Sequence, residues 1–230
     1  MGLQDDMTNE NPLSWRENGT PVSGRFDDPY FSLEDGLAET RHVFLGGNDL
    51  PERLRDGFHV AELGFGTGLS FLTLWQAWIA SDHYKTHGGQ IHFTSFEAFA
   101  LDTRDMAQAL LAFPELAPLA EQLVKAWPLS RANFGPITLT LWKGDARTML
   151  PLWSGAADAW FLDGFSPAKN PELWEPELMA QVGTHTAPGG TCATYTAAGH
   201  VRQSLEDAGF EITRAEGFGR KRHMTRGLKP

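Results

Sequence analysis

The sequence predicts a doubly wound α/β fold with a mostly parallel sheet, a terminal antiparallel hairpin and an N-terminal extension. From residue 58 onward, short apolar runs alternate with stretches of helical periodicity. A glycine-rich turn follows the first apolar run, and a helical period begins directly after it. Strand–turn–helix units of this kind assemble into parallel sheets covered by helices, because right-handed crossovers return the chain to the same sheet.

The N-terminal part of the chain lacks a long hydrophobic period of either kind. It starts with a polar, acidic stretch over residues 1–12 and continues with Gly, Asp and Pro in short succession. We therefore expect a flexible start, followed by turns and short strands. No linker or internal repeat divides the remainder, so the sequence predicts an extension over residues 1–57 packed on a main domain over residues 58–230.

The main domain opens with a predicted strand at residues 59–65 and a helix at residues 69–80. In that helix Leu69, Leu72 and Trp75 recur at helical spacing. The same criteria predict strands at 91–99, 137–146, 158–163 and 191–196, helices at 102–113, 114–127, 172–186 and 199–210, and turns or loops at 81–90 and 188–190. The segment 210–227 predicts the terminal hairpin.

Composition narrows the class of protein. The chain has 230 residues, of which 41% are hydrophobic, and a single cysteine, Cys192. One cysteine excludes an intrachain disulfide framework and a cysteine-based zinc site. No apolar run approaches the roughly 18 residues that a membrane span needs, and the polar start lacks the features of a signal peptide. We expect a cytoplasmic protein without membrane contact.

The charge is acidic overall and unevenly distributed. A net charge of −10 disfavours indiscriminate nucleic-acid binding, because a polyanion is repelled by it. The last twenty residues are basic by contrast, with Arg214, Arg220, Lys221, Arg222, Arg226 and Lys229. Two interpretations stay open: a local phosphate-contacting patch, or a solvated basic end that balances an acidic body.

The first candidate site is the glycine turn at residues 62–68, which reads Glu-Leu-Gly-Phe-Gly-Thr-Gly. Glycines after a strand let the backbone turn tightly and approach a ligand. The acid Glu62 would repel a pyrophosphate, whereas it suits a ligand that carries an ammonium or a sulfonium. The pattern resembles motif I of the class I S-adenosylmethionine methyltransferases, which implies cofactor contacts from Glu62, Gly64, Phe65, Gly66, Gly68 and Ser70. A plain glycine-rich turn is the alternative.

Two further acids stand at predicted strand ends. Glu97 ends the second strand of the main domain, where a carboxylate can accept two hydrogen bonds from ribose hydroxyls. The alternative is an acid that only faces solvent. At the end of the third strand, the methyltransferase resemblance implies that Asp145 accepts from the adenine amine and that Gly144 and Ala146 contact the ring.

The segment 161–174 carries the most specific pattern, FLDGFSPAKNPELW, after the fourth strand. Amino-directed methyltransferases carry a loop with an acid or amide and prolines at this place. An amine is mostly protonated at neutral pH, so Asp163 can attract the cation, orient it and accept its proton. Phe165 and Trp174 can stack on a flat base, and Lys169 can meet a phosphate. The alternative is a proline-rich loop that merely covers the sheet.

Together these segments resemble one family. The stretches 158–174 and 61–75, the N-terminal 19–48 and the closing 217–227 are similar to the methyltransferase domain of the bifunctional tRNA 5-methylaminomethyl-2-thiouridine biosynthesis proteins. The resemblance implies a Rossmann-like class I methyltransferase that uses S-adenosyl-L-methionine to methylate the aminomethyl group of the wobble uridine in tRNA. Ser70 and Ala98 depart from the family pattern, which has Asn and Lys there.

The resemblance also implies roles outside the loop. Asp163 and Phe165 are the expected catalytic residues, Asp163 also bordering the cofactor. The substrate is expected to meet Asp27, Asp28, Tyr30, Lys169, Asn170, Trp174, Arg220, Lys221 and Arg222. The family's flavin-dependent oxidoreductase half is absent from this sequence, so a separate protein of that kind is a candidate partner that supplies the aminomethyl substrate.

Alternatives from other classes stay open. One is a methyltransferase for another small-molecule or protein amine, and another is a non-catalytic module that only binds the cofactor. A hydrolase is disfavoured because Ser166 lacks the G-x-S-x-G context of a nucleophile elbow. His83 and His87 have i,i+4 spacing without the HExxH context, so no metal site is predicted.

Overall fold

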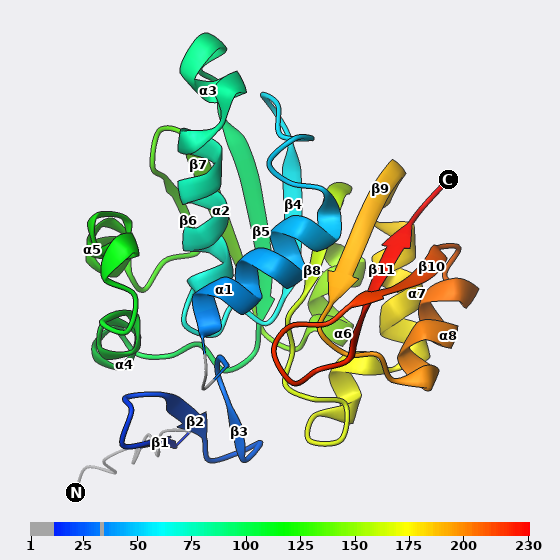
Figure 1. Ribbon diagram of the computed structural model, residues 1–230, viewed down its shortest axis with the longest axis horizontal. Coiled ribbons are helices and arrows are strands. Elements are labelled where there is room, and N and C mark those ends of the chain that lie inside the picture. The colour runs from blue at the N-terminus through cyan, green and yellow to red at the C-terminus, as the bar shows by residue number, and fades with distance from the viewer. Residues whose placement is uncertain (1–11, 33–34) are drawn as a thin grey trace, which may run out of the picture.

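The computed structural model describes residues 12–32 and 35–230 (Figure 1). The main sheet has eight strands in the order β10 (Glu211–Glu216), β11 (His223–Leu228), β9 (Thr186–Thr194), β8 (Ala157–Leu162), β4 (His59–Leu63), β5 (Ile91–Glu97), β7 (Ile137–Lys143) and β6 (Arg131–Asn133). The five strands from β9 to β7 are parallel, while β6 and the hairpin β10–β11 are antiparallel edges. The predicted fold class is confirmed.

The strand order places a crevice in the middle of the sheet. From β4 the chain moves outward to β5 and β7, and it then crosses back to β8 and β9 on the other side of β4. The order therefore reverses between β4 and β8. In doubly wound sheets, ligands bind outside the carboxyl ends of the strands at such a reversal.

Helices cover both faces of the sheet (Figure 1). They are α1 (Gly36–Thr40), η1 (Arg41–Leu45), η2 (Gly46–Asn48), α2 (Leu69–Ala80), α3 (Asp82–His87), α4 (Thr103–Leu110), η3 (Pro114–Leu116), α5 (Ala117–Ala126), α6 (Ala146–Met149), η4 (Leu150–Leu152), η5 (Pro171–Trp174), α7 (Pro176–Thr184) and α8 (Gly199–Asp207). Side chains of one strand alternate between two cores. In β8, Phe161 packs with α2, η1 and α5, whereas Trp160 and Leu162 pack with η4, α7 and α8.

The structure differs from the sequence prediction in the segment 36–48, where turns and short strands were expected and three consecutive helical turns are found. The Asp35 side chain caps the first turn by accepting from the Ala38 amide. The helical turns bury Val43 and Phe44 against the sheet. Gly46 and Gly47 fall inside the segment and lower its helical propensity, so the helix depends on tertiary packing.

Two smaller differences concern a loop and a turn. The predicted loop 81–90 contains the short helix α3, which Ser81 caps by accepting from the Tyr84 amide. The predicted turn at residues 188–190 lies within β9, where the pairing register with β8 shifts. The predicted hairpin and the helices after residue 58 are otherwise present.

A small antiparallel sheet precedes the helices on the chain. It consists of β1 (Leu13–Trp15), β2 (Pro21–Ser23) and β3 (Asp28–Pro29). Figure 1 shows it below the main sheet, at the end where the parallel strands terminate. The segment after it shares the core of the main sheet through Val43, Phe44 and Leu50. The division of the chain at residue 57 stays a prediction.

Two aspects of the sequence prediction concern the chain ends and membranes. The flexible start expected for residues 1–12 lies, apart from its last residue, outside the described residues. Within residues 12–32 and 35–230, no helix has the length and apolar character that crossing a membrane requires.

Candidate active site

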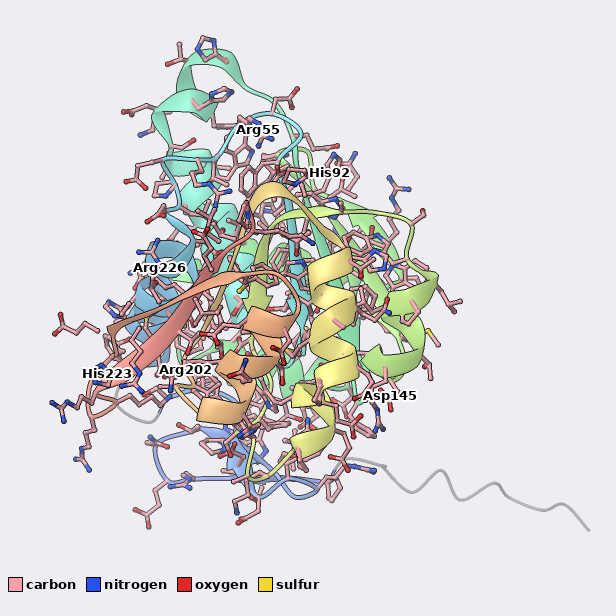
Figure 2. The ribbon with its side chains drawn as sticks, turned by 90° about the vertical axis from the view of Figure 1, so that its right-hand side faces the viewer. Arg55, His92, Asp145, Arg202, His223 and Arg226 are labelled. Carbon is pink, nitrogen blue, oxygen red and sulfur yellow. The ribbon has the colours of Figure 1, made fainter. Side chains whose placement is uncertain are left out.

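A cavity of about 1110 Å³ opens at the carboxyl ends of β4, β5 and β8. Its walls come from the glycine turn after β4, the residues after β5 and the loop after β8. The N-terminal sheet, α1 and the β10–β11 loop close the remaining sides. In Figure 2, Asp145 lies at the cavity end of the molecule, whereas Arg55 and His92 lie at the opposite end of the sheet. The volume lies at the upper end of the roughly 300–1,000 Å³ that is usual for small-molecule sites.

The glycine turn sits directly against the loop after β8. Gly64 and Gly66 have φ angles of +88° and +52°, in the left-handed region that favours glycine. A Cβ atom on Gly64 would lie 2.8 Å from the carbonyl oxygen of Asp163. Gly64, Phe65 and Gly66 line the cavity, while Gly68 precedes α2 and lies outside the lining. The glycines therefore let the turn after β4 and the loop after β8 approach each other closely.

Glu62 lies buried beneath the cavity and does not line it. One of its carboxylate oxygens accepts a hydrogen bond from the Ser95 hydroxyl at 2.7 Å. The other oxygen is buried and has no partner among the described residues. Burial raises the pKa of Glu62 well above its ordinary value, and the charge of Asp163 adds to the rise. A buried acceptor without a donor is costly, so this oxygen favours a ligand that brings a donor.

Glu97 is held in place by the backbone of two loops. Its carboxylate accepts from the Gly66 amide at 3.0 Å and from the Phe99 amide at 2.6 Å. Burial raises the pKa of Glu97, and these amides act in the opposite direction. The carboxylate lines the cavity and keeps further lone pairs for a ligand hydroxyl.

Asp145 and its neighbours lie at the end of β7. Asp145 lines the cavity and caps α6 by accepting from the Arg147 amide at 2.9 Å. It also pairs with the Arg147 guanidinium at 2.6 Å, and this hydrogen bond lowers the pKa of Asp145. Ala146 lines the cavity too, whereas Gly144 does not. The Asp145 carboxylate is thus already committed to two donors of its own helix.

Asp163 lies at the carboxyl end of β8, partly exposed to the cavity. Its carboxylate accepts from the Ser70 hydroxyl at 2.8 Å, across the glycine turn. Burial raises the pKa of Asp163 to about 7. A carboxylate with this proton affinity can both hold a cation and take up a proton near neutral pH.

Aromatic rings form one wall of the cavity. Phe165 lies 4.8 Å from Phe26 and 5.1 Å from Tyr30, measured between ring centroids. All three rings line the cavity. Trp174 is buried instead, and its indole donates to the Phe165 carbonyl at 2.9 Å. Trp174 therefore supports the loop that carries Phe165, and the stacking role expected for it receives no support from its position.

The N-terminal sheet is tied to the loop after β8 by two polar contacts. Lys169 donates to Asp27 at 2.6 Å, and the Ser166 amide donates to Asp28 at 2.8 Å. The Lys169 ion pair is exposed, so it contributes little energy by itself. Asp28, Lys169 and Asn170 line the cavity, while the exposed Asp27 is not part of the lining. Of the predicted N-terminal residues, Asp28 and Tyr30 therefore line the cavity, and Asp27 does not.

The basic residues of the β10–β11 loop have different surroundings. Arg220 and Lys221 line the cavity, whereas the exposed Arg222 does not. Lys221 donates to Glu39 of α1 at 2.7 Å, and its ammonium lies 4.2 Å from the centroid of the Tyr195 ring. Lys221 thus points at the cavity wall.

Sequence reasoning missed several residues that line this cavity. Phe99 follows Glu97 by two positions, and the Arg25 guanidinium lies 4.2 Å over its ring. Tyr195 comes directly after β9, so extending the strand-end rule to the fifth parallel strand would have found it. Glu39 carries no local signal, because only the fold brings α1 to the cavity.

Comparison with known proteins identifies the class. A family profile described as S-adenosyl-L-methionine-dependent methyltransferase matches residues 114–230, half of the chain. The chain belongs to this family. A crystal structure of MNMC2 from Aquifex aeolicus is 22% identical and superposes with a TM-score of 0.78 over 98% of this chain and 73% of that one. The precorrin-6y C5,15-methyltransferase of Geobacter metallireducens GS-15 is 14% identical, with a TM-score of 0.51 over 94% of this chain and 98% of that one. At these identities the two structures show a shared fold.

The site of this methyltransferase fits S-adenosyl-L-methionine. The carboxylate of Glu97 lines the cavity and suits hydroxyl donors, whereas Glu62 lies beneath the cavity floor. Gly64 and Gly66 leave room that side chains would fill. The individual contacts of these residues with the cofactor stay predictions, as does that of Asp145.

The methyltransferase carries no metal-binding cluster within the described residues. His83 and His87 lie 5.1 Å apart between ring centroids, on α3 or at its end. In Figure 1, α3 lies at the end of the sheet opposite the N-terminal strands and the cavity.

The raised pKa of Asp163 predicts a pH dependence of stability. Its pKa in the folded protein, about 7, exceeds the ordinary 3.8, so the folded state favours the protonated form. The resulting stabilisation is complete below about pH 4 and disappears as the pH rises through 7. Asp163→Asn should therefore unfold about 2–6 °C above wild type at pH 8, since about 1–2 kcal/mol remains after allowance for partial exposure.

Calorimetric melting of both proteins at several pH values tests this. The difference in melting temperature should shrink between pH 8 and pH 4. A difference that stays constant over this range would show that Asp163 is ionised in the folded protein throughout.

Proposed function

We propose that this methyltransferase transfers a methyl group from S-adenosyl-L-methionine to the aminomethyl group of 5-aminomethyl-(2-thio)uridine at the wobble position of tRNA. The observation that carries the proposal is the position of Asp163. Its carboxylate reaches the cavity beside the glycine turn and has a pKa of about 7, and the same cavity has an aromatic wall. A carboxylate beside aromatic rings suits a substrate in which a flat ring bears a basic amine.

The carboxylate of Asp163 serves the amine in two ways. It attracts the ammonium form by charge, and it accepts the proton whose loss creates the nucleophilic lone pair. Ser70 holds one carboxylate oxygen at 2.8 Å, so the other oxygen stays available to the amine. When bound, the cofactor supplies an electrophilic methyl group on its sulfonium. Orienting the amine by Asp163 gives the geometry that in-line displacement needs.

The aromatic wall suits the base that carries the amine. Phe165 stands between Phe26 and Tyr30, with Trp174 fixing its backbone. An unpaired pyrimidine base can stack on such rings. The two contacts of Asp27 and Asp28 with the loop after β8 hold the N-terminal sheet over this wall.

The choice of tRNA over other amines has two supports. The sequence resembles the methyltransferase domain of the tRNA 5-methylaminomethyl-2-thiouridine biosynthesis proteins, and the fold is that of the protein named MNMC2. Arg25 and Arg220 at the cavity are cations that can meet tRNA phosphates, although acids outnumber bases along the lining and the net charge is −10. A flavin-dependent oxidoreductase remains the proposed source of the aminomethyl substrate.

A direct assay tests the proposal. tRNA from cells that lack this methyltransferase is incubated with the protein and S-adenosylmethionine, and its nucleosides are analysed by mass spectrometry. One added methyl on the aminomethyluridine is the expected result. If the cofactor binds and a free small amine is methylated while the tRNA is not, the substrate belongs to another class of amines. Cofactor binding without turnover on either would indicate a non-catalytic module.

We expect the arginines of the β10–β11 loop to contribute to the salt dependence of tRNA binding. Replacing Arg220 and Arg222 by Gln should weaken tRNA binding and make the slope of log K against log salt less steep by about 1.4–1.8. The reason is that each phosphate contact releases counterions on binding, so the loss of two contacts lowers the number released. Lys85→Gln is the control, since Lys85 is exposed on α3, and α3 lies at the end of the sheet opposite the cavity. Binding titrations between 50 and 200 mM salt, roughly the range over which such slopes are resolved, give both quantities. An unchanged slope would remove the loop from the tRNA interface.

A further inference from the structure

The wall of the cavity next to Asp163 contains a binding place for a cation that is filled by the protein's own lysine. The ammonium of Lys221 lies 2.7 Å from a carboxylate oxygen of Glu39 and 4.2 Å from the centroid of the Tyr195 ring. A carboxylate beside an aromatic face is a known arrangement for recognising ammonium groups. Glu39, Tyr195 and Lys221 all line the cavity.

The two receiving side chains are fixed in position and Lys221 is the movable member. Glu39 is 13% exposed and belongs to α1, whereas the Lys221 side chain is 46% exposed and belongs to the β10–β11 loop. The Tyr195 hydroxyl donates to the Gly164 carbonyl at 2.7 Å, which sets the direction of its ring. The receiving groups would therefore remain in place if Lys221 withdrew.

This place adjoins the carboxylate proposed to serve the amine. Gly164, which accepts from Tyr195, follows Asp163 directly. The negative charge of Glu39 acts to raise the pKa of Asp163, and the positive charge of Lys221 acts to lower it. Both charges therefore lie within electrostatic reach of the Asp163 carboxylate.

We propose that Glu39 and the Tyr195 ring form an ammonium-binding subsite for the substrate amine, and that Lys221 occupies this subsite until the substrate displaces it. The inference rests on the proposed amine substrate. The ligand class is a primary ammonium on a methylene attached to a flat ring. The displaced Lys221 moves out with its loop, toward the side where the tRNA phosphates are expected.

Benzylammonium is a suitable probe because it carries an aminomethyl group on a flat ring, and benzyl alcohol is its neutral counterpart. Calorimetric titration at pH 7 compares wild type with Lys221→Met. Removal of the competing lysine should tighten benzylammonium binding at least fivefold and leave benzyl alcohol unaffected. Adding Glu39→Gln to Lys221→Met should abolish the gain. Lys85→Met removes the same charge from exposed α3 and should behave as wild type.

Several outcomes would overturn the inference: no gain in Lys221→Met, a gain that survives Glu39→Gln, or an equal gain for benzyl alcohol. Lys221→Gln provides a second variant if Lys221→Met does not fold, as judged from its melting curve. The assay needs no methyl transfer, so it separates the two proposals. A gain without methylation of tRNA refutes the tRNA substrate and keeps the subsite, whereas methylation without a gain refutes the subsite alone.

Discussion

Replacing Asp163 by Asn is expected to lower the rate of methyl transfer at least a hundredfold, while the affinity for S-adenosyl-L-methionine changes less than about threefold. General base catalysis contributes typically 10²–10⁴ in rate. Asn keeps the shape of the side chain and can still meet the Ser70 hydroxyl, which lies 2.8 Å from the carboxylate. It cannot accept the proton of the ammonium or attract its charge.

Single-turnover measurements with tRNA give the rate of transfer, and titration calorimetry gives the cofactor affinity. Asp207→Asn is the matched control, because Asp207 is exposed on α8 and bonds only to Gln203 of the same helix in the described contacts. It should retain both properties. If the cofactor affinity of Asp163→Asn falls together with transfer, Asp163 belongs to the cofactor site and its proposed role as base is wrong.

Replacing Glu97 by Leu is expected to weaken cofactor binding about a hundredfold. Glu97 accepts from the Gly66 and Phe99 amides, so Leu leaves both amides without their partner at the edge of the cavity. Hydrogen bonds to a charged group contribute about 1.5–3 kcal/mol each. Loss of the carboxylate also removes the acceptors proposed for the ribose hydroxyls.

Glu97→Gln provides the graded control, because its amide oxygen keeps one acceptor for the two backbone amides. Its affinity for the cofactor should fall between those of wild type and Glu97→Leu. Melting curves of each variant separate a loss of binding from a loss of folding. A Glu97→Leu protein that is folded and binds the cofactor as tightly as wild type would exclude Glu97 from the cofactor site.

Much of the site was predictable because parallel strands end together. Glu62 stands one residue before the end of β4, Glu97 ends β5 and Asp163 directly follows β8, and the carboxyl ends of these strands meet at one edge of the sheet. The glycine turn marked where β4 ends and α2 begins, since left-handed φ angles leave a signature in residue type. These features depend on residues that are neighbours along the chain.

Contacts between distant segments were not predictable in this way. The helical turns of residues 36–48 depend on the packing of Val43 and Phe44 on the sheet. No hydrophobic periodicity in this segment indicates that packing. The pairing of Glu39 with Lys221 joins positions 182 residues apart. Trp174 looked like a stacking residue in sequence, but η5 buries it and turns its indole toward the Phe165 carbonyl.

The sequence by itself determined the α/β class, the order of the main strands and helices, the glycine turn and the acids at the strand ends. Hydrophobic periodicity and the residue types of turns are local properties of the sequence, so these features can be predicted from one sequence alone. Only the tertiary structure decided which side chains share the cavity, that Glu62 lies beneath its floor, and that Lys221 faces Glu39. Those outcomes depend on burial and on long-range contacts, which set both the position of a side chain and its proton affinity.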